Sequence, residues 1–121
     1  MGDKQRQDLG ARTKAFAIRI IRLYSSLPKT TVAQVMGKQV LRSGTSVGAH
    51  YREARRAKSG ADFVSKIEGA LQELDETAYW LELLIEAGMV GKEKLENLLK
   101  ETEELIAMFV TMVKKVKGKK G

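Results

Sequence analysis

The chain has 121 residues, no cysteine and a net charge of +7. This length supports one hydrophobic core but not two, so we expect a single domain over residues 1–121. The lack of cysteine excludes disulfides, thiolate metal sites and a cysteine nucleophile, and is compatible with a reducing cytoplasm. Because no apolar stretch approaches the roughly 20 residues that cross a bilayer, and no apolar signal core begins the chain, we expect a cytoplasmic protein without a membrane partner.

Charge is segregated along the chain. Residues 1–60 carry 13 Lys and Arg against 3 Asp and Glu, a net charge of +10. Residues 61–112 carry 4 against 12, a net charge of −8, and residues 113–121 add five lysines and no acid. Such asymmetry often marks a surface for a charged partner.

The first two predicted helices cover residues 8–27 and 31–58. Apolar residues recur in both at steps of three and four, which is the spacing of one helix face. Pro28 ends the first run, because the residue before a proline is pushed out of the helical region. Thr30 or Thr31 suits the N-cap of the second.

The middle of the second helix, residues 43–49 (SGTSVGA), is poor in helix propensity. Each of its two glycines costs about 1 kcal/mol relative to alanine, so propensity alone would end the helix there. The apolar phase nevertheless continues through the segment, and small residues allow two helix backbones to approach closely. We therefore predict one uninterrupted helix.

Two further helices are predicted at residues 62–87 and 92–116, followed by a lysine- and glycine-rich tail at 117–121 that is expected to fray. Gly88 suits the left-handed residue that commonly follows a helix. Four antiparallel helices joined by short loops make up an all-α, up-down-up-down four-helix bundle. The core stripe predicted for the third helix is Phe63, Ile67, Ala70, Leu74, Ala78, Leu81 and Ile85.

Apolar residues outside the main stripes indicate a second buried surface, and hence a homo-oligomer. They are Tyr79 and Leu83 on the third helix, and Leu99, Ile106 and Val110 on the fourth. The alternative is a monomer with scattered exposed apolar residues, which all soluble proteins have. We interpret Tyr79 with Trp80 as a core or interface pair rather than as a ligand pocket.

Motifs that would carry catalysis or bind a metal are incomplete. His50 is the only histidine, and it precedes Glu53 by three residues, which reverses the Glu-x-x-His order of di-iron bundles. Residues 43–48 lack the Gly-Lys-Ser/Thr ending of a phosphate loop. Ser46, His50 and Glu53 share one helix, and nothing supplies an oxyanion hole. We expect no enzymatic activity, no cofactor and no metal.

Basic residues on the first two helices form the remaining candidate site. Arginine binds phosphates bidentately, and clustered cations gain affinity for nucleic acid from counterion release. Because aromatic residues are scarce, such binding should be insensitive to sequence and steep in salt. The candidate residues are Arg19, Arg22, Arg42, Arg52, Arg55, Arg56 and Lys58. The alternative is that the arginines from Arg52 to Arg56 pair with Glu68, Glu73, Glu76 or Glu82, within or between subunits.

Three motifs carry a family resemblance: residues 41–54 (LRSGTSVGAHYREA), the pair at 62–63 (DF) and residues 73–81 (ELDETAYWL). In order and spacing they resemble the bacterial four-helix-bundle family of proteins encoded by intervening sequences in 23S ribosomal RNA genes. The resemblance runs from about residue 27 to the end of the fourth helix. A more distant similarity links the chain to the accessory variability determinant of diversity-generating retroelements.

The resemblance implies a four-helix protomer in a ring-like homopentamer, with a basic surface toward nucleic acid and, in the retroelement relatives, a reverse transcriptase partner. It implies no catalytic residues. The chain departs from the family pattern at Tyr51, where an asparagine is usual. The positions that match the family motifs are Arg42, Ser46, Gly48, Glu53, Tyr79 and Trp80.

Taken together, the residues and the resemblance predict a non-enzymatic homo-oligomeric scaffold, with five copies as the expected number. We expect it to contact the backbone of RNA or DNA through basic residues of the first two helices. The alternative is a homo-oligomer that binds another protein, or is purely structural, and does not bind nucleic acid.

Overall fold

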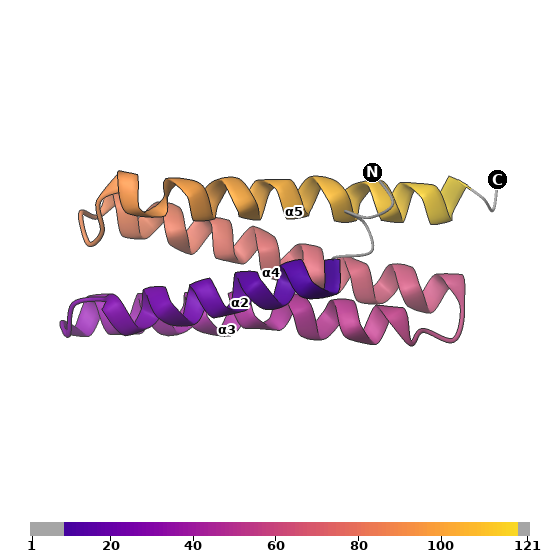
Figure 1. The fold of residues 1–121 in the computed structure, drawn as a ribbon, viewed down its shortest axis with the longest axis horizontal. Coiled ribbons are helices and arrows are strands. Elements are labelled where there is room, and N and C mark those ends of the chain that lie inside the picture. Colours follow the sequence, from indigo (N-terminus) through magenta and orange to yellow (C-terminus); the bar gives the residue numbers. More distant parts are fainter. Residues whose placement is uncertain (1–8, 119–121) are drawn as a thin grey trace.

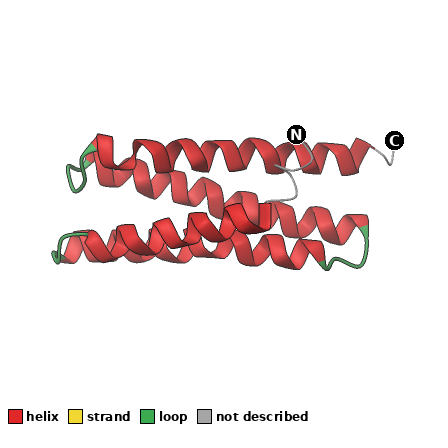
Figure 2. Cartoon of the chain, in the orientation of Figure 1, coloured by secondary structure: helices red, strands yellow, loops and turns green. Residues whose placement is uncertain are grey.

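The computed structural model describes residues 9–118 and shows four helices in antiparallel order (Figure 1). They are α2 (Leu9–Ser26), α3 (Thr31–Arg55), α4 (Gly60–Glu86) and α5 (Lys92–Gly118). Figure 2 shows only helices and loops in this part of the chain, so the predicted all-α four-helix architecture is confirmed there. None of these four helices is both long and apolar enough to cross a membrane.

Several predicted helix ends differ from the structure. The first helix ends at Ser26 rather than at residue 27, and α4 spans Gly60–Glu86 rather than residues 62–87. The second helix ends at Arg55 rather than at residue 58, because the N–H groups of Arg56 and Ala57 turn back to the carbonyls of Glu53 and Ala54 at 3.1 and 3.0 Å. The last helix continues through residues 117–118, which were predicted to fray. Residues 119–121 of that tail, and residue 8, the predicted start of the first helix, lie outside the described residues.

Side-chain caps explain where α3 and α4 begin. The Thr30 hydroxyl accepts a hydrogen bond from the N–H of Ala33 at 3.2 Å, and the Ser59 hydroxyl accepts one from the N–H of Asp62 at 3.1 Å. Each satisfies one of the N–H groups that the first helical turn leaves without a partner. After α4, Gly88 adopts a φ of 74°, which favours glycine and reverses the chain into α5.

The helices that follow one another in sequence pack closely, whereas α2 and α5 contact each other far less. Arg12 on α2 joins these two helices through hydrogen bonds to Glu101, at 3.0 and 2.6 Å, and to Glu104 at 3.0 Å. The hydrogen bond to Glu101 is the main reason that the pKa of Arg12 is raised. The largest fully buried side chains include Phe16, Ile20, Ile67, Leu74, Leu81, Leu105 and Phe109.

Close approach of α2 accounts for the glycines of α3. A Cβ on Gly44 would lie 2.7 Å from Cγ1 of the buried Ile20, and a Cβ on Gly48 would lie 3.2 Å from Thr13 Oγ1. The prediction that α3 is uninterrupted is confirmed. Its poor propensity is offset by packing that larger residues would prevent.

The stripe predicted for α4 is correct at four positions and displaced at both ends and at Ala78. Ile67, Ala70, Leu74 and Leu81 are buried, but Phe63, Ala78 and Ile85 are only partly so. Their neighbours Val64, Thr77 and Leu84 take the buried positions. Thr77 is tolerated in the core because its hydroxyl donates to the Glu73 carbonyl at 2.8 Å and lies 2.8 Å from the Ser43 hydroxyl.

Candidate nucleic-acid interface

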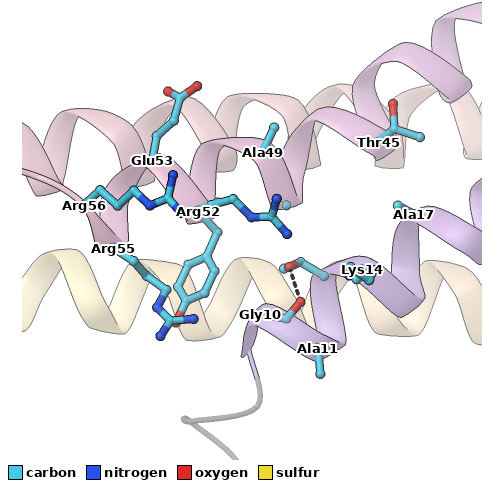
Figure 3. Close-up of a pocket in the computed structure, with 13 residues that line it drawn as sticks. Gly10, Ala11, Lys14, Ala17, Thr45, Ala49, Arg52, Glu53, Arg55 and Arg56 are labelled. Atoms are coloured by element: carbon cyan, nitrogen blue, oxygen red, sulfur yellow. Dashed lines mark hydrogen bonds between the residues drawn. The ribbon is translucent and has the colours of Figure 1, made fainter.

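A groove of about 700 Å³ lies between the first half of α2 and the second half of α3 (Figure 3). Small residues make up most of its floor. With few side-chain atoms above the backbone, the floor leaves room for an extended ligand. The small lining residues are Gly10, Ala11, Thr13, Ala17, Thr45, Gly48 and Ala49.

Four cations surround this floor: Lys14 from α2, and Arg52, Arg55 and Arg56 from the end of α3. All four are exposed. Figure 3 shows the arginines extending from α3, with Arg55 reaching toward the start of α2. The single acid of the lining, Glu53, has its Oε1 3.6 Å from the ammonium of Lys66, outside the groove. The groove is therefore strongly positive.

The groove arginines have no acidic partner in the described chain. Among residues 9–118, none of Arg52, Arg55 and Arg56 forms an ion pair. The glutamates proposed as alternative partners do not reach them. Glu73 and Glu76 pair with Arg42, and Glu68 pairs with Lys117 at 3.3 Å. Pairing within the chain therefore does not neutralise these three arginines.

Arg42 occupies a different place from the groove arginines. Its guanidinium bridges α3 to α4 by donating to Glu73 at 3.3 Å and to Glu76. The hydrogen bond to Glu76 is the largest contribution to the raised pKa of Arg42. The imidazole Nε2 of His50 lies 3.7 Å from the other Glu73 oxygen. Arg42 is thus occupied by an interhelical contact, although half of its side chain is exposed.

Arg19 and Arg22 line a second hollow, of about 390 Å³, between the end of α2 and the start of α5. Lys58, the last predicted residue, lies in the turn between α3 and α4, where its N–H donates to Asp62 at 3.2 Å. The structure therefore divides the predicted basic surface. Arg52, Arg55 and Arg56 are brought together with Lys14, which the sequence did not single out, and the other predicted residues lie elsewhere.

Tyr51 is the aromatic residue of the groove lining, but its ring is buried. It stacks on Phe109 of α5, with ring centroids 5.7 Å apart and an angle of 22° between the planes. Tyr51 thus links α3 to α5 across the core. Its helical spacing from Val47 and Ala54 was the signal for burial. The ring is not free to stack on a base.

The remaining motif residues have structural contacts. Ser46 donates to the Arg42 carbonyl at 2.7 Å, while His50 faces Glu73, so these two side chains do not form a nucleophile and base pair. His50 Nδ1 is buried without a hydrogen-bond partner in the described chain. Tyr79 and Trp80 pack edge to face, with centroids 5.3 Å apart, and Tyr79 is 57% exposed.

Comparisons with known proteins agree with this architecture. A crystal structure of a protein of unknown function from the S23 ribosomal protein family of Bacteroides thetaiotaomicron is similar to the chain, with 42% identity and a TM-score of 0.82. The similarity covers 87% of this chain and 97% of that one. No match was found among curated proteins. The sequence model of the 23S rRNA-intervening sequence proteins matches residues 7–111, so the chain belongs to that family.

Proposed function

We propose that the chain is a non-enzymatic homo-oligomeric scaffold that contacts the phosphate backbone of RNA or DNA through the groove between α2 and α3. The observation that carries this proposal is the set of cations around the groove. Lys14, Arg52, Arg55 and Arg56 surround a floor of small residues, and the three arginines form no ion pair among residues 9–118. The intervening-sequence origin in the family description supports RNA as one ligand.

The geometry of the groove fits a phosphate backbone. Arg56 caps the end of α3, four residues after Arg52, so the two Cα atoms are separated by about one helical turn, roughly 6 Å along the axis. Their guanidinium forks can donate two hydrogen bonds to each phosphate. Lys14 adds a point charge from the opposite wall. Because the floor of the groove carries only small side chains, the phosphate backbone can approach these donors without displacing a protein side chain.

The affinity of this groove for nucleic acid should not depend on base sequence. The buried Tyr51 ring cannot stack on a base, and Arg and Lys contacts to phosphates carry no sequence information. Affinity would come mainly from release of counterions, and it should fall steeply as salt rises.

The oligomeric part of the proposal is supported by apolar residues at the surface. Five large apolar side chains are 41–57% exposed: Ile18, Ile21, Val32, Val35 and Tyr79. The family resemblance favours a ring of five copies. A ring would place several grooves on one assembly, and binding at one groove would raise the effective concentration of nucleic acid at the next.

The test is fluorescence anisotropy with generic RNA and DNA at several salt concentrations. Arg52→Glu/Arg56→Glu should abolish binding to every sequence alike. The matched control, Lys29→Glu/Lys38→Glu, changes net charge equally at exposed lysines outside the groove, and it should retain most of the affinity.

Two outcomes would contradict the proposal. Equal losses in the two double variants would show that net charge, rather than the groove, attracts nucleic acid. A wild-type protein that does not bind at low salt would favour the alternative of a protein-binding or purely structural oligomer.

A further inference from the structure

Opposite charges lie on different helices of this chain. Residues 9–52 contain no Asp or Glu, and residues 67–91 contain no Lys or Arg. As a result α2 and most of α3 are cationic, and most of α4 is anionic. Within the described residues, ion pairs between α3 and α4 involve Arg42, His50 and Lys66, which leaves most charges of either sign without a partner.

The first surface of interest is the hollow between the end of α2 and the start of α5. Near the start of α2, Arg12 joins α2 to α5 by ion pairs with Glu101 and Glu104. Among the described residues, no ion pair joins the end of α2 to the start of α5. The cations of this hollow form no ion pair with any residue of the described chain. We call this surface the basic seam, with the cations Arg19, Arg22 and Lys94 around the apolar Leu23, Val90, Leu95 and Leu98.

The second surface lies on α4 and the start of α3. Asp75, Tyr79, Glu82 and Glu86 are spaced four, three and four residues apart, so they share one outward face of α4. All four are exposed, and the carboxylates form no ion pair among residues 9–118.

Exposed valines continue this surface onto α3. Val35 lies seven residues before Arg42, and hence on the same side of α3, while Tyr79 lies three residues after the Arg42 partner Glu76. Val32 and Val35 are 52% and 56% exposed. We call this surface the acidic face, with Val32, Val35, Asp75, Tyr79, Glu82 and Glu86.

We propose that the acidic face of one copy docks into the basic seam of the next, so that copies assemble head to tail. The inference rests on the homo-oligomer part of the proposed function. Each surface combines charged side chains of one sign with accessible apolar ones, and the two signs are opposite. The accessible apolar residues are the partly buried Leu23 and Val90 in the seam, and the exposed Val32, Val35 and Tyr79 on the face. Apolar area removed from water would supply affinity, and the charges would select partner and orientation.

The charges also select a second copy in this arrangement over a symmetric dimer. In a two-fold contact centred on the basic seam, seam would meet seam, and Arg19 and Arg22 would lie against their own copies, which is unfavourable. A head-to-tail contact brings unlike surfaces together, and it closes into a ring when its rotation allows.

The phosphate groove stays outside this contact. The basic seam and the acidic face both lie toward the end of the bundle that holds the α2–α3 and α4–α5 turns (Figure 1). The groove lies toward the other end, near the α3–α4 turn. Assembly and phosphate binding can therefore be perturbed separately.

Charge reversal on each surface tests the pairing, with light scattering after size exclusion as the measurement. Arg19→Glu/Arg22→Glu and Glu82→Arg/Glu86→Arg should each give a folded monomer of 13.5 kDa by circular dichroism and scattering. An equimolar mixture should assemble again, because the reversed seam of the first variant then meets the reversed face of the second. The unchanged face of the first variant likewise meets the unchanged seam of the second. The mixed assembly should contain even numbers of copies, since the two variants must alternate. The groove variant Arg52→Glu/Arg56→Glu should remain assembled.

Each other outcome overturns the inference in a distinct way. A wild-type monomer would remove this inference and the oligomeric part of the proposed function, but would leave nucleic-acid binding by the groove untouched. If the wild type is oligomeric and either double variant stays assembled, the oligomer stands and these surfaces are not its interface. If both variants dissociate and their mixture does not assemble, the two surfaces are not each other's partners.

Discussion

Substitution of Gly44 by alanine tests whether close packing of α2 holds α3 together. The added Cβ would lie 2.7 Å from Ile20 Cγ1 and 3.0 Å from both Cδ1 and Cγ2 of that side chain. Ile20 is fully buried and β-branched, so it has little freedom to move aside. In an exposed helix the same change would stabilise by about 1 kcal/mol, because alanine has the higher helix propensity.

Overpacking should outweigh that propensity gain. Extra methyl groups in a packed core cost about 1–3 kcal/mol, so Gly44→Ala should lower the free energy of unfolding by about 0–2 kcal/mol. Ile20→Ala removes all three atoms that the new methyl would meet. In that background Gly44→Ala should instead stabilise by about 1 kcal/mol, which is a reversal of sign.

Urea unfolding of the wild type, the two single variants and the double variant measures the coupling between Gly44 and Ile20. All four proteins are compared at one concentration, because oligomers gain stability with concentration. Gly10→Ala is the control, since its Cβ would lie at an ordinary 3.4 Å from the flexible end of Arg55. It should be neutral or slightly stabilising. Equal stabilisation by Gly44→Ala in both backgrounds would refute the role given to this glycine.

Other substitutions test individual contacts. Arg12→Ala should lower the free energy of unfolding by about 1–2 kcal/mol in urea melts, because Arg12 joins α2 to α5. The exposed Lys14→Ala should have almost no effect on stability, and equal losses would contradict the role of Arg12. Ser43→Ala and Thr77→Val should each cost about 1 kcal/mol, since each removes the hydrogen bond between the two buried hydroxyls. The double variant should cost less than their sum, and additive costs would argue against the contact. Arg42→Ala should leave the salt dependence of nucleic-acid binding unchanged, and a slope lower by about 1 would place Arg42 on a phosphate.

The helices could be predicted because their apolar residues keep a helical period throughout. Even the glycine-containing part of α3 kept that phase, so its continuity was predictable against propensity. The stripe of α4 was displaced at Thr77 because hydrophobicity alone scores threonine as polar. Its hydroxyl is satisfied inside the core by Glu73 and Ser43, which the sequence does not reveal.

The arginine positions could not be resolved from sequence. Arg42 and Arg52 are ten residues apart, which places them about 80° apart around α3. This difference turns Arg42 toward α4 and Arg52 toward the α2 side. A sequence pattern gives the angle between two residues on a helix, but not which neighbouring helix lies on each side. Lys14 was overlooked for the same reason, since only the packing of α2 on α3 brings it to the groove.

The salt dependence of nucleic-acid affinity tests the central claim most directly. For double-stranded DNA, each phosphate neutralised contributes about 0.9 to the slope of log affinity against log salt, and for single strands about 0.7. Substitution of Arg52, Arg55 or Arg56 by alanine, one at a time, removes one phosphate contact from each groove that binds nucleic acid. Each substitution should therefore lower the slope by the value for one phosphate, multiplied by the number of grooves that bind, for every sequence tested. An unchanged slope in all three variants, with affinity intact, would contradict phosphate binding by this groove.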